Sequence, residues 1–504
     1  MKKGLTINLP KKVFSSQSIR NIEKSAIKSL NGDDYLLMER AGISAFEEAL
    51  KCYPNAKNWQ IICGVGNNAG DGMVVARLAL EHNLTVSVST LSSPDVLKGN
   101  AFKAYKKLKE YKSHQSAIKV KINQWEGQID DNIDLIVDAI FGIGLNRNLN
   151  SFYKSAIKTI NNAGLPIFSI DIPSGIHPDK GKIMGAAIKA STTITFIGKK
   201  LGFFDNEGIN HYGNLKLCGL GISETHYNNE KEILSILSDD FIHQVLPKRK
   251  KNSHKGEFGH IAIVGGGPGM HGAVCIAGEA ALRSGAGKVS IFTHISHNSL
   301  IADAKPELIF NFFEEVDEIK PMLLGVDVIV IGPGLGTNKW AREVFESITD
   351  IDCPMIVDAD ALNILSKKPI KQENWILTPH PGEAGRLLGI SSKKMQQNRF
   401  SSLNNLIEKY HGVIVLKGHH TLIGSNDSVP CVCVKGNPGM ASAGMGDALT
   451  GIIASMIGQG MPLNIAASLG VEIHAKAGDR AATKGQRGLL AGDLINELRG
   501  CVNL

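Results

Sequence analysis

The stretch WQIICGVGNNAGDGMVVARLALEHNLTVSVSTL, residues 59–91, contains the unit from which the rest of the chain is built. A short apolar run (59–63) leads into a glycine-rich loop, a helix-like segment (73–83) follows, and a β-branched run (84–91) closes the unit. Unbroken apolar strands that alternate with helices are typical of parallel sheets covered by helices on both faces. The stretch therefore predicts two parallel strands joined by a helix.

The same pattern recurs in two series along the 504 residues. The first series continues with apolar runs at 133–145, 166–176 and 192–200, and the second contains runs at 259–272, 287–293, 326–336, 354–362, 375–383 and 412–421. A chain of this length exceeds one ordinary hydrophobic core. We therefore expect two three-layer α/β/α domains, with ligand-binding loops at the carboxyl ends of their strands.

The boundary between the two domains is expected at about 222–255, where charged and polar residues are frequent. We predict domains at 1–228 and 229–504. Residues 232–247, between the two polar stretches, look like a helical entry to the second domain.

The composition argues against a nucleic-acid-binding, a membrane or a secreted protein. The formal charge is +7, and the one lysine-rich run, 246–256, is interpreted as a solvated linker because no aromatic residues are interleaved with it. We therefore expect no nucleic-acid partner, and we expect no membrane partner because no run is long and apolar enough to span a bilayer. The N-terminus lacks an apolar signal segment, and the eight cysteines form no CxxC pair, so Cys431 and Cys433 are predicted as core residues of one strand. These features indicate a cytoplasmic protein.

The loop GVGNNAGDG, residues 64–72, is suited to an anionic ligand. Its glycines let backbone N–H groups approach a ligand at the start of the following helix. Asn67 and Asn68 add amide donors and acceptors. Asp71 is either a binding residue or simply the helix N-cap.

Two further strand ends carry acidic residues. Asp138 ends one apolar run, and Asp171 ends the next, followed by Ser174. Buried carboxylates without a partner are costly, so packing alone does not explain this gathering. Asn68, Asp138 and Ser174 could form an oxygen-only cation site, which suits an alkali or alkaline-earth ion better than zinc.

The motifs GVGNNAGDG, DAIFGIGL and DIPSGI together resemble those of the NAD(P)H-hydrate epimerases, the YjeF N-terminal family, over about residues 10–225. Ala69 stands where that family usually has glycine. The resemblance implies a Rossmann-like fold, potassium on Asn68, Asp138 and Ser174, and a catalytic Asp171 that contacts the substrate. It also implies that the hydrated nucleotide contacts Asn67, Asn68, Ala69, Gly70, Asp71, Gly142, Ile143, Gly144, Leu145, Asn146, Arg147 and Asn148. A carboxylate beside the ring could transfer protons and stabilise a cationic ring.

The second half has its own motifs at strand ends. GPGLG occupies 332–336, TPHPGE 378–383 and VLKGHHTLI 415–423. His380, between two prolines, is either a ligand-binding residue or a loop histidine with ordinary hydrogen bonds. The lysine and two histidines of the third motif could line a nucleotide phosphate or sugar.

The stretch GNPGMASAGMGDALTGIIASMIG, residues 436–458, places glycines ahead of an apolar helix-like run. Backbone N–H groups at 443–446 would form an anion hole for a transferring phosphoryl group. Asp447, in the first helical turn, could take a proton from an attacking hydroxyl. The alternative is that Asp447 only stabilises the start of the helix.

These four motifs, in this order, resemble the ADP-dependent NAD(P)H-hydrate dehydratases of the ribokinase-like superfamily, over about residues 240–500. The resemblance implies that Ala273, Gly336, His380 and Asp447 contact the hydrate. It also implies that Lys417, Gly418, His419, His420, Thr421 and Gly446 bind the adenine nucleotide, with Mg²⁺ on its phosphates and ADP as phosphoryl donor.

The two resemblances together imply a bifunctional repair enzyme for hydrated NADH and NADPH (NADHX and NADPHX). The first half would epimerise the R and S hydrates, and the second would dehydrate the S form. A homo-oligomer is expected. Two alternatives stay open: a small-molecule kinase with a regulatory N-terminal half, and a nucleotide-sensing protein without turnover.

Overall fold

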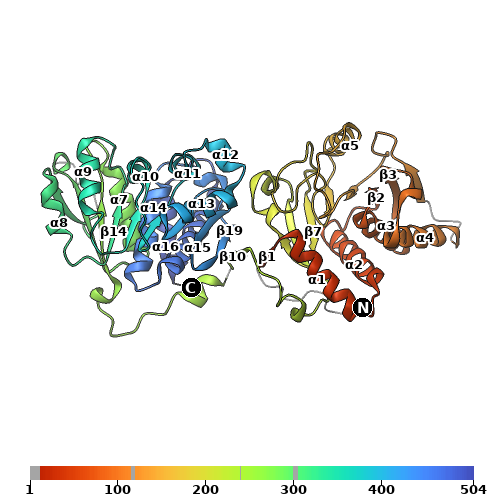
Figure 1. Cartoon of the computed structure of the whole chain (residues 1–504), viewed down its shortest axis with the longest axis horizontal. Helices are drawn as coiled ribbons and strands as arrows, with labels where there is room; N and C mark the ends of the chain where they lie inside the picture. Colours follow the sequence, from red (N-terminus) through yellow and green to blue (C-terminus); the bar gives the residue numbers. More distant parts are fainter. Residues whose placement is uncertain (1–11, 115–119, 239, 299–304, 504) are drawn as a thin grey trace. The chain divides into compact units, whose positions relative to one another are not determined.

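The computed structural model describes residues 12–114, 120–238, 240–298 and 305–503 (Figure 1). The chain divides into two compact units, Met1–Leu234 (unit 1) and Ser235–Leu504 (unit 2). All eight cysteines are free thiols. Among the described residues, no helix combines the length and the apolarity that a membrane span requires.

Unit 1 is built on a parallel sheet in the order β4-β3-β2-β5-β6-β7-β9. The chain leaves β2 towards one edge of the sheet and later builds outward from β5 towards the other, so β2 and β5 flank the topological switch point. The strands are β2 (Asn58–Cys63), β3 (Thr85–Thr90), β4 (Val120–Gln124), β5 (Leu135–Ala139), β6 (Ile167–Ile170), β7 (Thr192–Phe196) and β9 (Asn214–Cys218).

Helices cover both faces of this sheet, as predicted. Ile61 and Cys63 of β2 pack in one core cluster with helices α2, α3 and α4, whereas Ile62 points the other way and packs with α5. Unit 1 also contains a short parallel pair, β1 (Lys12–Phe14) and β8 (Lys199–Lys200), which is not part of this seven-stranded sheet. The helices are α1 (Ser16–Ser29), α2 (Asp34–Cys52), α3 (Asn67–Glu81), α4 (Gly99–His114) and α5 (Ser151–Asn161).

Unit 2 contains a larger sheet in the order β13-β12-β11-β14-β15-β16-β17-β18-β19-β10. The strands from β13 to β17 are parallel; β18 and β19 then form an antiparallel hairpin, and β10 runs parallel to β19. The strands are β10 (Leu234–Ile236), β11 (His260–Val264), β12 (Lys288–His294), β13 (Ile309–Phe313), β14 (Val328–Ile331), β15 (Met355–Val357), β16 (Trp375–Leu377), β17 (Val413–Leu416), β18 (Thr421–Ser425) and β19 (Ser428–Cys433).

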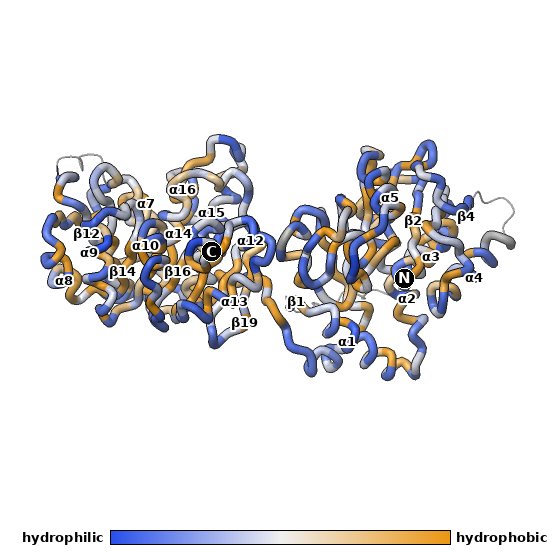
Figure 2. Tube along the Cα trace, turned by 45° about the horizontal axis from the view of Figure 1, so that its top comes forward, coloured by the Kyte–Doolittle hydropathy of each residue, from blue (hydrophilic) through white to orange (hydrophobic). Residues whose placement is uncertain are grey.

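Unit 2 also has three layers. Val328 and Val330 of β14 pack in one cluster with α7, α14, α15 and α16, while Trp375 of β16 contacts Phe345 of α9 on the other face. Figure 2 shows hydrophobic residues along central strands such as β14 and β16. The main helices are α7 (His271–Arg283), α9 (Lys339–Ile348), α10 (Ala359–Leu365), α11 (Pro381–Leu388), α13 (Arg399–Tyr410), α14 (Met445–Gly458), α15 (Leu463–Ala481) and α16 (Ala491–Val502).

The prediction of one helix over 232–247 is wrong. Leu234–Ile236 forms strand β10, and only Phe241–Val245 forms a helix, α6. Leu234 and Ile236 are buried and alternate with Ser235, which is the period of a strand, and β10 pairs with the otherwise open edge of β19.

The prediction for the two cysteines of β19 is confirmed. The Cys431 thiol contacts the Ser468 hydroxyl and the Cys433 thiol contacts the Glu472 carboxylate, and both partners lie on α15. The two thiols therefore share the face of β19 that packs against this helix.

Candidate active sites

The first candidate site lies at the carboxyl edge of the unit 1 sheet, where the loops after β2 and β5 meet. The two loops are close enough that a Cβ added at Gly64 would lie 2.1 Å from the Ile140 carbonyl oxygen, so only glycine fits there. Helix α3 begins after Gly66, and no side chain caps it. Asp71 lies a full turn inside the helix, so the N-cap hypothesis for this residue is wrong.

A cavity of about 710 Å³ opens at this edge. Most of the residues that the epimerase resemblance implied line its wall: Asn67, Asn68, Asp71, Gly142, Ile143, Gly144, Leu145, Asn146, Arg147 and Asp171. Ala69 and Gly70 are buried in the core side of α3, and Asn148 is exposed; none of these three lines the cavity. A Cβ at Gly70 would lie 2.6 Å from the Met38 sulfur, so Gly70 serves helix packing.

Asp171 is held in a defined position at the cavity wall. Its φ of +69° lies in the left-handed region, which costs a non-glycine residue about 1–3 kcal/mol. Its N–H donates to the Ile194 carbonyl at 2.7 Å, and one carboxylate oxygen accepts the Ile143 N–H at 3.2 Å. The other oxygen accepts from Lys200 Nζ at 2.6 Å.

Lys200, on β8, is fully buried beneath this carboxylate. Its ammonium group also donates to Thr195 Oγ1 at 2.6 Å and to the Phe196 carbonyl at 3.1 Å. Three acceptors satisfy the three N–H donors, so the lysine is a fixed buried cation paired with Asp171.

Asp138, Ser174 and Asn68 converge beside this cavity. The fully buried Asp138 carboxylate accepts from the Ser174 hydroxyl at 2.5 Å, from the Ser174 N–H at 2.9 Å and from the Ser169 hydroxyl at 2.8 Å. Burial raises the pKa of Asp138, against the lowering effect of these hydrogen bonds. Its partners are neutral donors, and no described cationic side chain pairs with it.

Asn68 supplies the second part of this arrangement. Its side-chain oxygen and nitrogen are both buried, and neither has a hydrogen-bond partner among the described residues. Its Cβ lies near Gly142, next to Phe141, whose N–H donates to the Ser174 hydroxyl at 2.8 Å. An orphaned amide oxygen near a buried carboxylate fits a monovalent cation bound through oxygen.

Two further acids face the cavity. Burial raises the pKa of Asp71 well above its usual range, and the charges of Asp171 and Glu23 raise it further. Burial, followed by the charge of Asp171, also raises the pKa of Glu23. The cavity therefore holds two carboxyl groups that retain a proton more readily than ordinary acids, beside one that is paired with a lysine.

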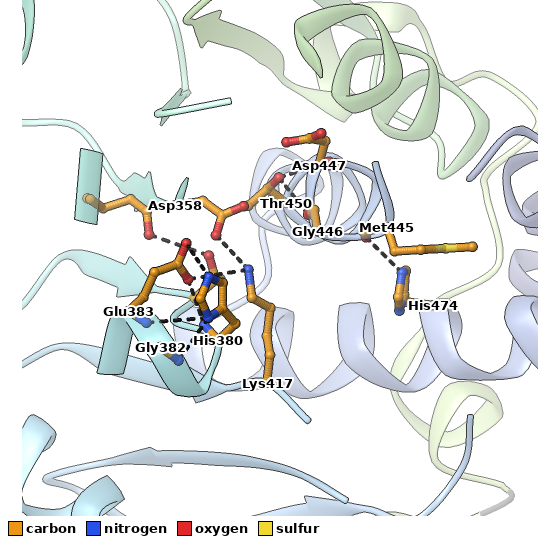
Figure 3. A network of polar contacts seen from close by, with 12 residues as sticks. Asp358, His380, Gly382, Glu383, Lys417, Met445, Gly446, Asp447, Thr450 and His474 are labelled. Atoms are coloured by element: carbon orange, nitrogen blue, oxygen red, sulfur yellow. Dashed lines mark hydrogen bonds and ion pairs between the residues drawn. The ribbon is translucent and has the colours of Figure 1, made fainter. Parts of the chain in front are cut away.

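The second candidate site lies at the carboxyl edge of the unit 2 sheet, where α14 begins (Figure 3). Gly444 is the N-cap with φ +86°, and no side chain caps the helix. A Cβ at Gly444 would lie 2.8 Å from Ile276 Cδ1, and one at Gly446 would lie 3.3 Å from Lys417 Nζ. The glycines thus allow a left-handed turn and a close approach to lysine, and they leave backbone N–H groups at the helix start for an anion.

Asp447 lies in the first turn of α14, and its carboxyl group makes no hydrogen bond with any described residue (Figure 3). Asp447 therefore forms no capping hydrogen bond, but a carboxylate in the first turn can still stabilise the helix start through the helix dipole, so that alternative stays open. Burial, followed by the charge of Asp358, raises the pKa of Asp447 to about 7, although Lys417 opposes this shift. A carboxyl group that titrates near neutral pH is well suited to general-base chemistry.

Lys417 links the acids of this site. Its ammonium group donates to the Asp358 carboxylate at 2.8 Å and lies 3.9 Å from the Glu383 carboxylate. Burial is the largest single influence on the pKa of Lys417 and lowers it, but the charges of Asp358 and Glu383 together outweigh burial and raise it. Burial raises the pKa of Glu383 to about 7. The Lys417 ammonium group therefore interacts electrostatically with three carboxyl groups, those of Asp358, Glu383 and Asp447.

His380 is both a helix cap and a partly exposed site residue. Its Nδ1 accepts the N–H groups of Gly382 at 2.9 Å and Glu383 at 3.3 Å, and its own backbone N–H donates to the Glu383 carboxylate at 2.7 Å (Figure 3). Because Nδ1 is an acceptor, a neutral ring carries its proton on Nε2. Burial lowers the pKa of His380, so the ring is neutral near pH 7 and can donate from Nε2.

Arg399 of α13 holds the loop from Lys417 to Thr421 in place through hydrogen bonds to its backbone. The buried guanidinium donates to the carbonyls of His419 at 2.5 Å and His420 at 3.0 Å. The two histidine rings stack at 4.3 Å, with His419 exposed and His420 buried. Gly418 is exposed and Thr421 half-buried. Burial lowers the pKa of His420 to about 3, so this ring is a neutral packing element of the loop.

Gly336 and Ala273 border the same edge of the sheet. Gly336, with φ +81°, donates its N–H to the Asp360 carboxylate at 2.8 Å. The Asp360 charge is one of those that raise the pKa of Asp447. Ala273 is in the first turn of α7, and a Cβ at Gly334 would lie 3.3 Å from its own Cβ.

Sequence reasoning did not single out Lys200, Glu23, Asp358, Glu383 or Arg399. Asp358 follows strand β15 directly, and Glu383 completes the TPHPGE motif, so the rule of polar residues at strand ends could have found both. No comparable signal marks Lys200, Glu23 or Arg399, because their roles depend on the spatial order of strands and helices.

Comparison with known proteins agrees with this geometry. Residues 34–202 match a family model described as YjeF-related protein N-terminus, and residues 261–499 match one described as NAD(P)H-hydrate dehydratase. The bifunctional NAD(P)H-hydrate repair enzyme of Coxiella burnetii is 42% identical over 97% of this chain and 99% of its own. The chain belongs to the family of bifunctional NAD(P)H-hydrate repair enzymes.

Other relatives extend this result. The family member from Escherichia coli is 37% identical over 100% of this chain and 96% of its own length. A ribokinase-like superfamily protein of Enterococcus faecalis matches with a TM-score of 0.50 and 29% identity, over 55% of this chain and 97% of that protein. The resemblances seen in the sequence, the α/β fold class and the assignment as an enzyme are therefore confirmed.

Proposed function

We propose that residues 1–228 interconvert the R and S forms of NADHX and NADPHX, and that residues 229–504 convert the S form to NADH or NADPH at the expense of ADP. The observation that carries the proposal is Asp447: a carboxyl group without a hydrogen bond to any described residue, with a pKa of about 7, at an uncapped helix start. Family membership supports the same division of labour.

In the epimerase half, the residues of the cavity would handle protons at the C6 hydroxyl of the hydrated ring. Asp71 or Glu23, whose pKa values are raised by burial, would protonate the hydroxyl as the C6–O bond breaks and water departs. The Asp171 carboxylate would stabilise the cationic ring and take a proton from the water that returns to the opposite face of C6. Lys200 would keep Asp171 in position.

Potassium would bind Asn68, Asp138 and Ser174, whose oxygens fit such an ion. When bound, it would balance the buried charge of Asp138 and attract the phosphates of the substrate. Asn67 and the loop from Gly142 to Asn148 would hold the nucleotide, with Arg147 as a cation for its phosphates. Ala69 and Gly70 would act through the backbone at the start of α3.

In the dehydratase half, the oxygen of the C6 hydroxyl would attack the β-phosphorus of ADP, and the bond between that phosphorus and AMP would break. Asp447 would take the proton of the hydroxyl during this attack. The backbone at 444–446 would hold the transferring phosphoryl group. The ring nitrogen then expels phosphate from C6, and a proton leaves C5 to restore the dihydronicotinamide. His380, Gly336 and Ala273 would position the hydrate, and Gly446 with the loop Lys417–Thr421 would hold the nucleotide.

Mg²⁺ also fits this half. Asp358 and Asp447 both interact with Lys417, and the charge of Asp360 also acts on Asp447; an oxygen-rich set with excess negative charge suits a hard divalent cation. Asp360 would hold it together with the nucleotide phosphates, whose charge it would neutralise, and Asp447 would remain free to act as the base.

The proposal is tested with Asp447→Asn in the full chain, by following the dihydronicotinamide absorbance formed from the S hydrate. We expect the ADP-dependent rate to fall about 10²–10⁴-fold with nucleotide binding kept. Asp427→Asn, an exposed carboxyl group between β18 and β19, is the matched control and should keep the wild-type rate. Full activity in Asp447→Asn would remove the proposed base.

The same assay separates the alternatives. Faster phosphorylation of a small alcohol than of the hydrate would indicate a kinase, and nucleotide binding without turnover would indicate a sensor. Replacement of ADP by ATP tests the donor, for which we propose ADP.

We also propose a cytoplasmic homo-oligomer. The free thiols of all eight cysteines suit a reducing compartment. Sedimentation equilibrium of the full chain tests the oligomer, and a monomer at micromolar concentration would contradict it.

A further inference from the structure

Unit 2 contains a second cavity, of about 680 Å³, far from Asp447. It lies where α7, α14 and α16 end and where the segment after α6 passes over them. Helix α14 has 14 residues and carries Asp447 at its start, so its far end is about 20 Å from that residue. This cavity is therefore separate from the proposed dehydratase site.

Positive charge gathers in this cavity. Lys248, Arg249, Arg283 and Arg499 line it, and none of its described lining residues is an aspartate or a glutamate. Lys248 and Arg499 form no ion pair with any described residue, whereas Arg283 Nε lies 3.9 Å from the carboxylate of Glu279, which does not line the cavity. Four cations, one of them paired with a carboxylate, give the cavity a positive potential.

One of these cations is fixed by its neighbours. Arg249 stacks on the Phe258 ring at 3.7 Å and donates to the Gly285 carbonyl. Gln459 donates to the neighbouring Ser284 carbonyl at 3.2 Å. The carbonyls at the end of α7, which would repel an anion, are thus already hydrogen-bonded.

Ser284 provides an independent sign of a ligand. The residue lines the cavity and is only 2% exposed, and its buried hydroxyl has no hydrogen-bond partner among the described residues. Buried polar groups are nearly always satisfied, so an orphaned hydroxyl in a cationic wall indicates a missing polar partner.

We propose that this cavity binds a phosphorylated small molecule with an apolar body, about the size of a mononucleotide. The arginine guanidinium groups suit phosphate oxygens, and the Ser284 hydroxyl would donate to the same group. Ile242, Leu246 and Val502 provide an apolar wall for the rest of the ligand. A hollow with a buried hydroxyl favours a small molecule over RNA or a membrane, which would need only surface charge.

Isothermal titration calorimetry of the full chain with AMP tests the proposal. AMP is also a product of the proposed dehydration, so two variants with the same change in net charge are compared. Arg283→Glu with Arg499→Glu should lose one class of AMP sites. Lys250→Glu with Lys251→Glu should keep it, because these exposed lysines follow Arg249 in the same basic segment but do not line the cavity.

A milder variant guards against misfolding of the charge reversals. Ser284→Ala should weaken AMP binding at this site about threefold to tenfold while the melting temperature stays near that of the wild type. Inorganic phosphate, which cannot use the apolar wall, should bind at least tenfold more weakly than AMP.

Several results would overturn the proposal: AMP stoichiometry that is equal in both double variants, a wild-type titration without this class of sites, or equal affinity for AMP and inorganic phosphate. A different outcome is that the wild type binds an RNA oligonucleotide or anionic phospholipid vesicles, and that both double variants lose that binding equally. This result would assign the positive charge to a surface for a macromolecule or a membrane.

Discussion

The two candidate active sites use the same backbone arrangement and differ in how they hold their acids. Each lies at the carboxyl edge of a mainly parallel sheet, beside glycine loops and an uncapped helix start. In unit 1, Asp171 is bonded to the buried Lys200 at 2.6 Å. In unit 2, Asp447 makes no hydrogen bond with described residues, and burial raises its pKa to about 7. The same scaffold thus holds one carboxylate in an ion pair and leaves the other without a hydrogen bond to the described residues, which suits the base proposed for it.

The largest expected effect concerns the ion pair of unit 1. Lys200→Met leaves the Asp171 carboxylate without its buried cation, which should destabilise unit 1 by about 3–5 kcal/mol and abolish epimerisation. Urea unfolding of the full chain, followed with a probe in each unit, measures this loss. Lys189→Met, an exposed lysine in the same unit, is the control.

The double variant Asp171→Asn with Lys200→Met sharpens this test. It removes both charges, so it should recover much of the lost stability but none of the epimerase activity. If Lys200→Met alone unfolds at the wild-type urea concentration, the pair is not the buried support that the contacts indicate.

The pH dependence should separate the two halves. The base must be deprotonated, so kcat/KM for dehydration should fall about tenfold per pH unit below pH 7, where Asp447 becomes protonated. Glu383, whose pKa burial also raises to about 7, does not contact the reacting hydroxyl in our proposal. Glu383→Gln should therefore show the same fall in kcat/KM below pH 7. If the fall disappears in that variant, the titrating group is Glu383 and not Asp447.

Potassium dependence tests the oxygen cluster of unit 1. Ser174→Ala should lower epimerisation about tenfold and raise the potassium concentration needed for half-maximal rate. Ser169→Ala is a matched control, because Ser169 also donates to Asp138 at 2.8 Å but is not a proposed potassium ligand. If the two variants respond identically, Ser174 acts only through its hydrogen bond to Asp138 and not as a potassium ligand.

The smallest effect is on the stability of unit 2. The pKa of Asp447 is about 7 in the folded chain and near 4 when unfolded, so its ionisation destabilises the fold increasingly as pH rises from 4 to 7. Asp447→Asn removes this cost, and at pH 8 it should stabilise unit 2 by about 1–2 kcal/mol, with no gain at pH 4. Melting temperatures at the two pH values measure it; equal shifts would contradict the raised pKa.

The sequence predicted the strand-end residues well, because local rules govern them. Apolar runs that end in aspartate placed Asp138 and Asp171 at strand ends, and glycines ahead of an apolar run placed Asp447 in a first helical turn, where the structure has them. The glycine at 64 has a clear physical reason, since any Cβ at this position would lie 2.1 Å from the neighbouring carbonyl oxygen.

Long-range partners could not be predicted in the same way. Lys200 reaches Asp171 only because β7 lies next to β6, and Glu23 reaches the cavity from α1, so neither contact follows from spacing. The missed strand β10 has the same cause: three residues with strand periodicity pair with β19, almost 200 residues later. The basic run at 246–256 is predicted as a linker, yet four of its residues, Leu246, Pro247, Lys248 and Arg249, line a cavity closed by distant helix ends.

The most direct test of two separate sites is the consumption of a mixture of R and S hydrates with ADP, in the full chain, followed by dihydronicotinamide absorbance. We expect the wild type to consume both epimers, Asp171→Ala to stop abruptly once the S form is gone, and Asp447→Asn to form almost no product. Complete consumption of both epimers by Asp171→Ala at the wild-type rate would contradict the account.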